Sequence, residues 1–245
     1  MISFLLTILA GFSTMIGTIP IFFKKQSKKL LITSLGFASG VMATISFTDL
    51  LPSSFSSLRE SYVFFPAFLM VAICFCVGVI FSFSVDHFLP QEKMKYGKLY
   101  QVGLISCLAI IMHNIPEGII TYLTSSSDLR LGVALTLAIA LHNIPEGISI
   151  SVPIYYSTGS RKKALLYTFI SGISEPFGAV LAFIFLAPFV NSFVMGILYA
   201  FIAGIMIHIS IYELLPESCS YQQIKTTIFS FLFGCFFMFL GHFLF

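Results

Sequence analysis

Two nearly identical stretches, IIMHNIPEGII at residues 110–120 and AIALHNIPEGISI at residues 138–150, decide how this chain folds. Each lies about a dozen residues into a long apolar run, and about 20 apolar residues are enough to cross a bilayer as a helix. The shared hexapeptide HNIPEG therefore falls near the middle of two membrane-spanning helices. A carboxylate at that depth costs roughly 2.5–3.5 kcal/mol, so each glutamate needs a partner that offsets this cost.

Helical geometry brings the polar residues of each copy together. His113 and Glu117 are four residues apart, as are His142 and Glu146, so each pair shares one helix face. Each proline removes a backbone N–H and displaces the carbonyl four residues back, and each glycine lets another helix approach closely. The other matching positions of the two copies are Asn114 and Asn143, Pro116 and Pro145, and Gly118 and Gly147. One interpretation is polar contact between helices, and the other is a divalent-metal site. Two copies at midplane depth favour the metal site.

The composition is that of a polytopic membrane protein. Of the 245 residues, 58% are hydrophobic and 9% are charged, and the mean hydropathy is +0.99, whereas a soluble domain carries about 25% charged residues. The net charge is +3, and the positively charged residues lie in short loops, so the charge does not indicate a nucleic-acid partner. Five cysteines without framework spacing exclude both a zinc finger and a disulfide scaffold. We expect one transmembrane domain over residues 1–245 and no cofactor.

Apolar runs predict an all-α protein of eight transmembrane helices. The first run has no positively charged segment before it, so we expect a retained helix rather than a secretory signal. Helix two is expected to end at Pro52, before a serine-rich loop. With boundaries good to about ±2–4 residues, the predicted helices cover residues 1–23, 30–52, 63–88, 100–124, 130–154, 163–186, 193–215 and 225–245.

The positive charges predict the orientation of these helices. Two of the thirteen Lys and Arg residues, Arg59 and Arg130, fall on one side of the membrane. The other eleven fall on the opposite side, which the positive-inside rule makes cytoplasmic. Both termini are then extracytoplasmic, and we expect a multi-pass protein of the bacterial plasma membrane. The eleven are Lys24, Lys25, Lys28, Lys29, Lys93, Lys95, Lys98, Arg161, Lys162, Lys163 and Lys225.

The chain also contains inverted internal repeats. Residues 37–54 (FASGVMATISFTDLLPSS) align without gaps to residues 201–218 (FIAGIMIHISIYELLPES), with nine identities in eighteen positions. Helices two and seven run in opposite directions, as do the two helices that carry HNIPEG. A fainter match places Gly11, Ser13 and Gly17 of the first helix opposite Gly172, Ser174 and Gly178 of the sixth. Inverted repeats around a polar midplane site are typical of alternating-access transporters.

Other polar residues lie within or near the predicted helices. Glu175 is deep in helix six with no cation inside any helix to pair with it, so we assign it to the metal site. His208 has two possible roles, as a hydrogen-bonded core residue or as a metal ligand on the transport path. Three acidic positions lie near helix ends: Asp49, Glu213 and the pair Asp86–His87. Each is either a metal-binding step at the entry or exit of the transport path or a solvated acid. We assign no role to His242.

These residues resemble the ZIP family of divalent-metal transporters, and within it the compact bacterial type. The resemblance rests on the doubled HNIPEG, the Glu–Pro of helix six, the AGxM-like segments and the acidic-Leu-Leu-Pro endings, and it covers essentially the whole chain. It implies eight helices with both termini outside and import of metal into the cytoplasm by sliding or rocking of helix bundles. A homodimer is left open, and membrane lipid is an expected partner.

The resemblance also implies a ligand set. A main site uses two imidazoles and two carboxylates, and an adjacent site shares the two glutamates. Some relatives carry Asp at the position of Asn143 and Gln at that of His142, so the adjacent site loses a carboxylate here. The implied ligands are His113, Glu117, His142 and Glu146 for the main site, Asn114, Asn143 and Glu175 for the adjacent site, and Met42, whose repeat counterpart is Met206.

Mixed nitrogen and oxygen ligands suit Zn²⁺, Fe²⁺, Co²⁺, Mn²⁺ or Cd²⁺, and the lack of a thiolate favours a broad-range importer. Two other functions fit the same residues. An intramembrane zinc-dependent hydrolase would need an open ligand position and a separate proton-shuttling acid. A proton-coupled solute carrier would titrate the acids without metal. The inverted repeats favour metal transport over both, and we expect no enzyme activity.

Overall fold

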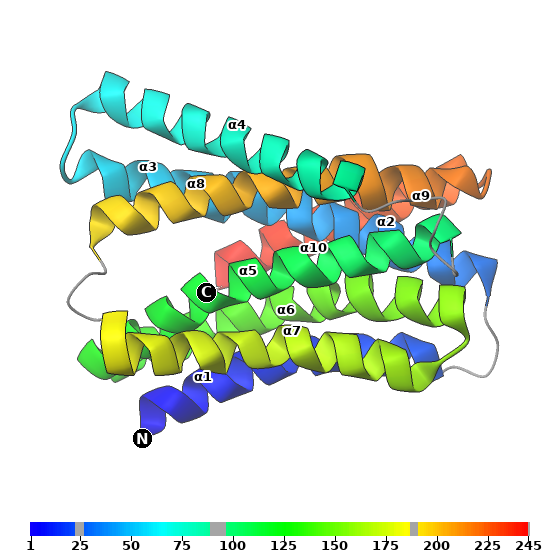
Figure 1. Ribbon diagram of the computed structural model, residues 1–245, viewed down its shortest axis with the longest axis horizontal. Coiled ribbons are helices and arrows are strands. Elements are labelled where there is room, and N and C mark those ends of the chain that lie inside the picture. The colour runs from blue at the N-terminus through cyan, green and yellow to red at the C-terminus, as the bar shows by residue number, and fades with distance from the viewer. Residues whose placement is uncertain (23–26, 89–96, 187–190, 245) are drawn as a thin grey trace.

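The fold is a bundle of helices in a computed structural model that describes residues 1–22, 27–88, 97–186 and 191–244 (Figure 1). The elements labelled η are one 3₁₀ segment (η1) and three π-helical segments (η2, η4 and η5), and the rest are α-helices. The helical elements are α1 (Ile2–Ser13), η1 (Thr14–Phe22), α2 (Lys28–Ile45), η2 (Ser46–Leu50), α3 (Leu51–Arg59), α4 (Phe64–Phe88), α5 (Gly97–Ser127), α6 (Leu129–Thr158), α7 (Arg161–Leu181), η4 (Ala182–Leu186), α8 (Ser192–His208), η5 (Ile209–Leu214), α9 (Leu215–Ser220) and α10 (Ile224–Leu244).

The described residues form eight spans that are long and apolar enough to cross a membrane, so the predicted fold class is confirmed. Local signals set their ends. Asp128 caps α6 by accepting hydrogen bonds from the backbone N–H groups of Arg130 and Leu131, at 2.8 and 3.1 Å. Gly159, with a φ of +66°, ends α6 in the left-handed conformation, and Ser160 caps α7. These caps allow the tight turns that bring α5, α6 and α7 together.

The prediction that helix two ends at Pro52 is wrong. A π-helical turn, η2, precedes the proline, and the N–H of Leu51 bonds five residues back to Ser46. The wider turn shifts the hydrogen-bond register by one residue, so the helix continues through Pro52 to Arg59 as α3. Helix seven behaves in the same way: η5 precedes Pro216, and α9 continues to Ser220.

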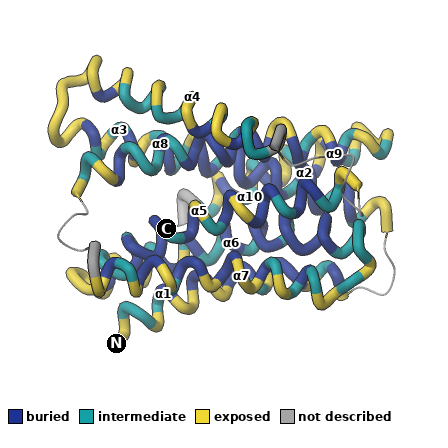
Figure 2. Tube along the Cα trace, viewed as in Figure 1, coloured by how far each residue is buried: buried dark blue, intermediate teal, exposed yellow. Residues whose placement is uncertain are grey.

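The spans form two groups (Figure 1). In one group α2 packs along α10, and α8 packs along α3 and α4. In the other, α5, α6 and α7 pack against one another and against α1 and η1. The longest seam between the groups joins α2 to α6. Buried residues follow the inward faces of the helices and exposed residues the outer ones, as Figure 2 shows. In a bilayer, those exposed apolar faces contact lipid.

Equivalent contacts recur in the two aligned repeats of the α2–α8 group. The Ser54 hydroxyl donates to the Gly196 carbonyl at 2.6 Å, and its counterpart Ser218 donates to the Ile32 carbonyl at 3.0 Å. The π-helical turns η2 and η5 also fall at matching positions. A Cβ at Gly40 would overlap the Phe231 carbonyl of α10, and one at the matching Gly204 would overlap the Phe75 carbonyl of α4. These contacts relate α2 to α8 and α10 to α4.

The other group repeats its contacts in the same manner. Gly118 of α5 lies against the backbone carbonyl of Glu175 in α7, and Gly147 of α6 lies against that of Thr14 in η1. A Cβ at either glycine would overlap the carbonyl oxygen. The match pairs α5 with α6 and places Thr14 opposite Glu175, as the faint sequence repeat predicts.

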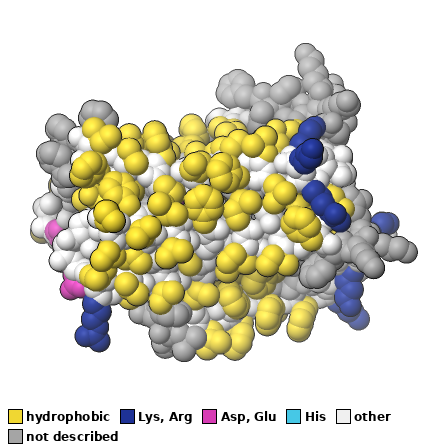
Figure 3. Space-filling view, turned by 90° about the horizontal axis from the view of Figure 1, so that it is seen from below, with side chains coloured by type: hydrophobic (Ala, Val, Ile, Leu, Met, Phe, Trp, Pro, Cys, Tyr) yellow, Lys and Arg dark blue, Asp and Glu magenta, His cyan; other side chains and the backbone are white. Residues whose placement is uncertain are grey.

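The described Lys and Arg side chains gather mainly at one end of the molecule, and acidic side chains show at the other (Figure 3). Lys28 and Lys29 begin α2, Lys225 stands in the first turn of α10, and Arg130 lies at the opposite end. Residues 24, 25, 93 and 95, also assigned to the lysine-rich end, lie outside the described residues. Which end faces the cytoplasm stays a prediction.

Candidate metal centre

The two HNIPEG copies meet where α5 and α6 pack side by side. Both helices continue unbroken through their motif prolines, Pro116 and Pro145. Because His and Glu are one turn apart in each helix, all four side chains turn towards the helix–helix contact. The imidazole rings of His113 and His142 lie 6.1 Å apart, measured between ring centroids.

Carboxylate and imidazole atoms crowd together at this contact. Oε1 of Glu117 lies 3.0 Å from Nε2 of His113 and 3.0 Å from Nε2 of His142. Oε1 of Glu146 lies 3.6 Å from Nε2 of His113. One ligand atom each from His113, His142 and Glu146 lies within 4.8 Å of the others. Atoms this close together are near enough to bind one cation in common.

This cluster is rich in acceptors and poor in donors. Both carboxylate oxygens of Glu146 and one of Glu117 are buried without a hydrogen-bond partner. Glu146 is 0% exposed and Glu117 7% exposed. Buried polar atoms are ordinarily satisfied, since leaving one unpaired is costly. Several carboxylate oxygens without donors therefore fit a positively charged ligand better than polar contact between helices.

A second set of polar atoms adjoins the cluster. The Asn143 side-chain amide donates to Oε2 of Glu175 at 3.0 Å and to the Ala10 carbonyl at 2.9 Å. The Asn114 amide donates to the Ser171 carbonyl at 3.0 Å. Both amide oxygens, together with Oε1 of Glu175, are buried and unpartnered. Three oxygens thus remain free to accept, contributed by α5, α6 and α7.

The two halves of the site differ at one pair of positions. Glu175 stands in α7, and its counterpart Thr14 stands in η1 with a buried hydroxyl that has no hydrogen-bond partner. The carboxylate is present in one half only, so the adjacent set of oxygens is less charged than the main cluster.

A cavity of about 160 Å³ reaches the cluster from the end of the molecule opposite the lysines. Glu117 and His142 form its inner wall, and Asp49 lies along it. Asp49 was expected on a transit path from its place in the sequence, whereas Tyr199 and Met238, which also line the cavity from α8 and α10, were not. Tyr199 and Met238 carry no motif, and nothing in the sequence marks which face of their helices meets α5 and α6.

The remaining predicted site residues stand on helices other than α5, α6 and α7. His208 is buried between α8 and α4, where its Nδ1 lies 2.9 Å from the Ser82 hydroxyl and its ring stacks on Tyr212. This contact favours the core interpretation. Met42 and Met206 are buried in α2 and α8, and Glu213 is buried in η5. The side chains of Asp86, His87 and His242 lie outside the described residues. All five cysteines are free.

Comparison with known proteins identifies the family. A profile described as "ZIP Zinc transporter" matches residues 90–242, which is more than half of the chain. The chain belongs to the ZIP family. Proteins of this family are transporters, so the prediction that the chain is not an enzyme is confirmed, and metal is cargo for it rather than a cofactor.

The similar ZIP-family proteins cover almost the whole chain. A protein of Campylobacter jejuni named "Zinc transporter ZupT" is 38% identical, over 95% of this chain and 92% of the relative. Proteins of the same name from Streptococcus mutans and Clostridium perfringens are 37% and 38% identical, over 95% and 96% of this chain and 93% and 92% of the relatives. The resemblance of the sequence to the compact bacterial ZIP type is thereby confirmed.

Proposed function

We propose that this protein imports divalent transition-metal cations, zinc foremost, through the buried cluster between α5 and α6. One observation carries the proposal: His113, His142 and Glu146 bring ligand atoms within 4.8 Å of one another, beside carboxylate oxygens that have no hydrogen-bond partner. The names of the bacterial ZIP relatives support zinc as the cargo. Imidazole and carboxylate ligands also suit Fe²⁺, Co²⁺, Mn²⁺ and Cd²⁺, so the proposed range is broad.

The ligands divide into a main site and an adjacent one. His113, Glu117, His142 and Glu146 hold the cation in the main site. The unpartnered oxygens of Asn114, Asn143 and Glu175 form the adjacent site, with the two glutamates shared. Apart from the two shared glutamates, the adjacent site has one carboxylate and two neutral amides and no imidazole, so it holds metal weakly and serves as a step along the path. Met42 remains a proposed contributor from α2.

The cavity beside Asp49 supplies a route to the main site. It ends on Glu117 and His142, so a cation entering from this end meets Asp49 first and the cluster second. The predicted orientation makes this end extracytoplasmic. Glu213 occupies the repeat position equivalent to Asp49 and is proposed as the station at the cytoplasmic end.

Alternating access is supported by the two helix groups and their repeated contacts. Inverted repeats allow one fold to close either end of a central path in turn. The cluster lies within the α1–α5–α6–α7 group, while Asp49 and Tyr199 belong to the other group. Movement of one group along the other would therefore carry the site from one access path to the other. One transporter domain spanning residues 1–245 of a bacterial inner-membrane protein completes the proposal.

Zinc uptake into proteoliposomes tests this function. We expect uptake by the natural sequence and none by Glu117→Ala or Glu146→Ala, since each glutamate serves both proposed sites. His113→Ala and His142→Ala should weaken apparent affinity at least about tenfold, as loss of a metal-site residue does. The exposed Glu60 gives a matched control, and Glu60→Ala should transport normally. Normal uptake by either site-glutamate variant would contradict the site, and competition by the other metals measures the range.

A further inference from the structure

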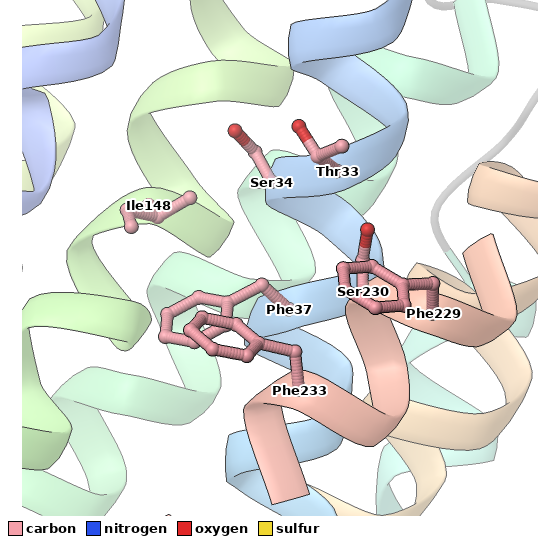
Figure 4. A pocket seen from close by; sticks show the side chains of 7 residues that line it. All are labelled: Thr33, Ser34, Phe37, Ile148, Phe229, Ser230 and Phe233. Atoms are coloured by element: carbon pink, nitrogen blue, oxygen red, sulfur yellow. The ribbon is translucent and has the colours of Figure 1, made fainter. Parts of the chain in front are cut away.

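A pocket of about 330 Å³ lies on the seam between α2, α10 and α6, and the proposed transport path does not use it. The rings of Phe37 in α2 and Phe233 in α10 pack at one end, with centroids 5.8 Å apart (Figure 4). Ile148 of α6 forms the facing wall, two residues beyond Glu146. Its volume is in the range of about 300–1,000 Å³ that is usual for ligand pockets.

The other end of the pocket is more polar. Thr33 and Ser34 stand there, nearer the lysine-rich start of α2 than Phe37 is (Figure 4). Phe229 and Phe233 are 73% and 51% exposed, so the pocket is open on the outer surface of the bundle. In a membrane that surface faces lipid, and an apolar hollow facing lipid is filled by acyl chain rather than by water.

Two lysines stand one helical turn beyond the polar end. Lys29 precedes Thr33 by four residues and Lys225 precedes Phe229 by four, so each shares a helix face with a residue that lines the pocket. Both lysines are exposed, and neither has an ion-pair partner among the described residues. They lie in the first turns of α2 and α10, about 6 Å along the helix axis from the pocket.

Along the helices, the lysines come before the pocket, as the charged headgroup of a phospholipid comes before its acyl chains. Basic residues at the end of a membrane-spanning helix lie at headgroup level, and a pocket one turn deeper lies at the level of the upper acyl chain. We propose that the pocket binds an acyl chain of an anionic phospholipid, whose phosphate is held by Lys29 and Lys225.

The lysines and hydroxyls at this seam are not repeated at the matching seam of the other half of the fold. The contacts of Gly40 and Gly204 relate α2 to α8 and α10 to α4. By the same alignment, apolar residues occupy all the equivalent positions of the other half. The equivalents of Lys29 and Lys225 are Phe193 and Leu69. Those of Thr33 and Ser34 are Ile197 and Leu198. Lysines and hydroxyls therefore occupy these positions at one seam only, at the end of the molecule where most of the lysines lie.

Fluorescence quenching tests the proposal, because the chain has no tryptophan. Phe229→Trp places a single reporter at the pocket mouth. The protein is reconstituted into vesicles of phosphatidylcholine and phosphatidylglycerol, with bromine on the acyl chains of one lipid or the other. We expect brominated phosphatidylglycerol to quench this reporter more strongly at equal mole fraction, with an enrichment of about fivefold for each lysine engaged. Equal quenching by the two lipids would overturn the proposal.

Two further variants make the test specific. Ile73→Trp puts the reporter at the matching, lipid-exposed position of α4, where we expect no preference between the lipids. Lys29→Gln with Lys225→Gln, in the Phe229→Trp chain, should abolish the preference while brominated phosphatidylcholine still quenches. A preference that survives both substitutions, or one equally strong at Ile73→Trp, would also overturn it. Quenching requires no transport, so this result is independent of the proposed metal uptake.

Discussion

At the scale of single residues, the two glutamates of the repeated motif are not equivalent. Glu117 lies 3.0 Å from both histidines. The nearest histidine nitrogen to Glu146 is Nε2 of His113, at 3.6 Å, and neither Glu146 oxygen has a hydrogen-bond partner. Identical hexapeptides therefore occupy unequal surroundings. The elements that pack behind the two copies also differ, since α7 carries Glu175 where η1 carries Thr14.

The difference between Glu175 and Thr14 leads to a prediction about metal content. Glu175→Gln removes a charge from the adjacent site alone, so we expect slower uptake with at least one metal still bound per protein. Asn143→Asp adds a carboxylate and should tighten the second metal. Both are measured as metal content of purified protein beside uptake rates.

Asn114→Asp is the comparison for Asn143→Asp, because the Asn114 amide also donates to a carbonyl, that of Ser171. Asn114→Asp loses one donated hydrogen bond, to the Ser171 carbonyl. Asn143→Asp loses two, to Glu175 and the Ala10 carbonyl, and needs a cation to replace them. Two equally tight metals in the natural protein, or none after Glu175→Gln, would contradict the ranking of the two sites.

At the scale of helices, prolines and glycines have different effects on this fold. Pro52 and Pro216 each follow a π-helical turn, and the helix continues beyond them. Gly118 and Gly147 set how closely α5 and α6 approach α7 and η1. Since Glu117 and Glu146 precede these two glycines, the close approach also fixes where the carboxylates lie.

We expect Gly118→Ala to destabilise the protein and weaken zinc binding. The added Cβ would overlap the backbone of Glu175, and overpacking of this kind costs about 1–3 kcal/mol. Gly241→Ala is the matched control, because its Cβ would lie 3.7 Å from the Leu141 side chain, an ordinary contact. Thermal unfolding in detergent and zinc titration measure both effects. Equal melting temperatures for the two variants would show that this close approach does not hold α5 against α7.

At the scale of the whole molecule, the two helix groups and the charged ends define the transport axis. The lysine-rich end carries the starts of α2, α7 and α10, and the cavity beside Asp49 opens towards the other end. If the lysine-rich end is cytoplasmic, this cavity admits metal from outside, which is the direction of import.

Cys219 in α9 provides a test of that orientation. In a variant that retains Cys219 as its single cysteine, an impermeant thiol reagent added to intact cells should leave the protein unlabelled. Opening the cells should then allow labelling. The exposed Ser127, in the last turn of α5 at the opposite end, serves as the control, and Ser127→Cys without the other cysteines should react from outside. Labelling of Cys219 in intact cells would reverse the assignment.

The membrane spans and the polar motif follow from local features of the sequence. Apolar length sets which segments cross the membrane, and a spacing of four residues places His113 with Glu117 and His142 with Glu146 on single helix faces. Both properties are local to one helix, so they can be read without knowing its neighbours. The repeated segments likewise indicated which helices have matching contacts.

Which helix faces meet is known only from the packed bundle. It turned His208 towards Ser82 rather than towards the metal cluster, and it brought Tyr199 and Met238 to the cavity beside Asp49. It also let the helix continue past Pro52, where the sequence indicated an end. Almost every face of a membrane helix is apolar, so hydrophobic periodicity does not distinguish a face that packs on protein from one that faces lipid. That choice depends on side-chain fit between helices distant in the sequence, which is settled only when all of them pack together.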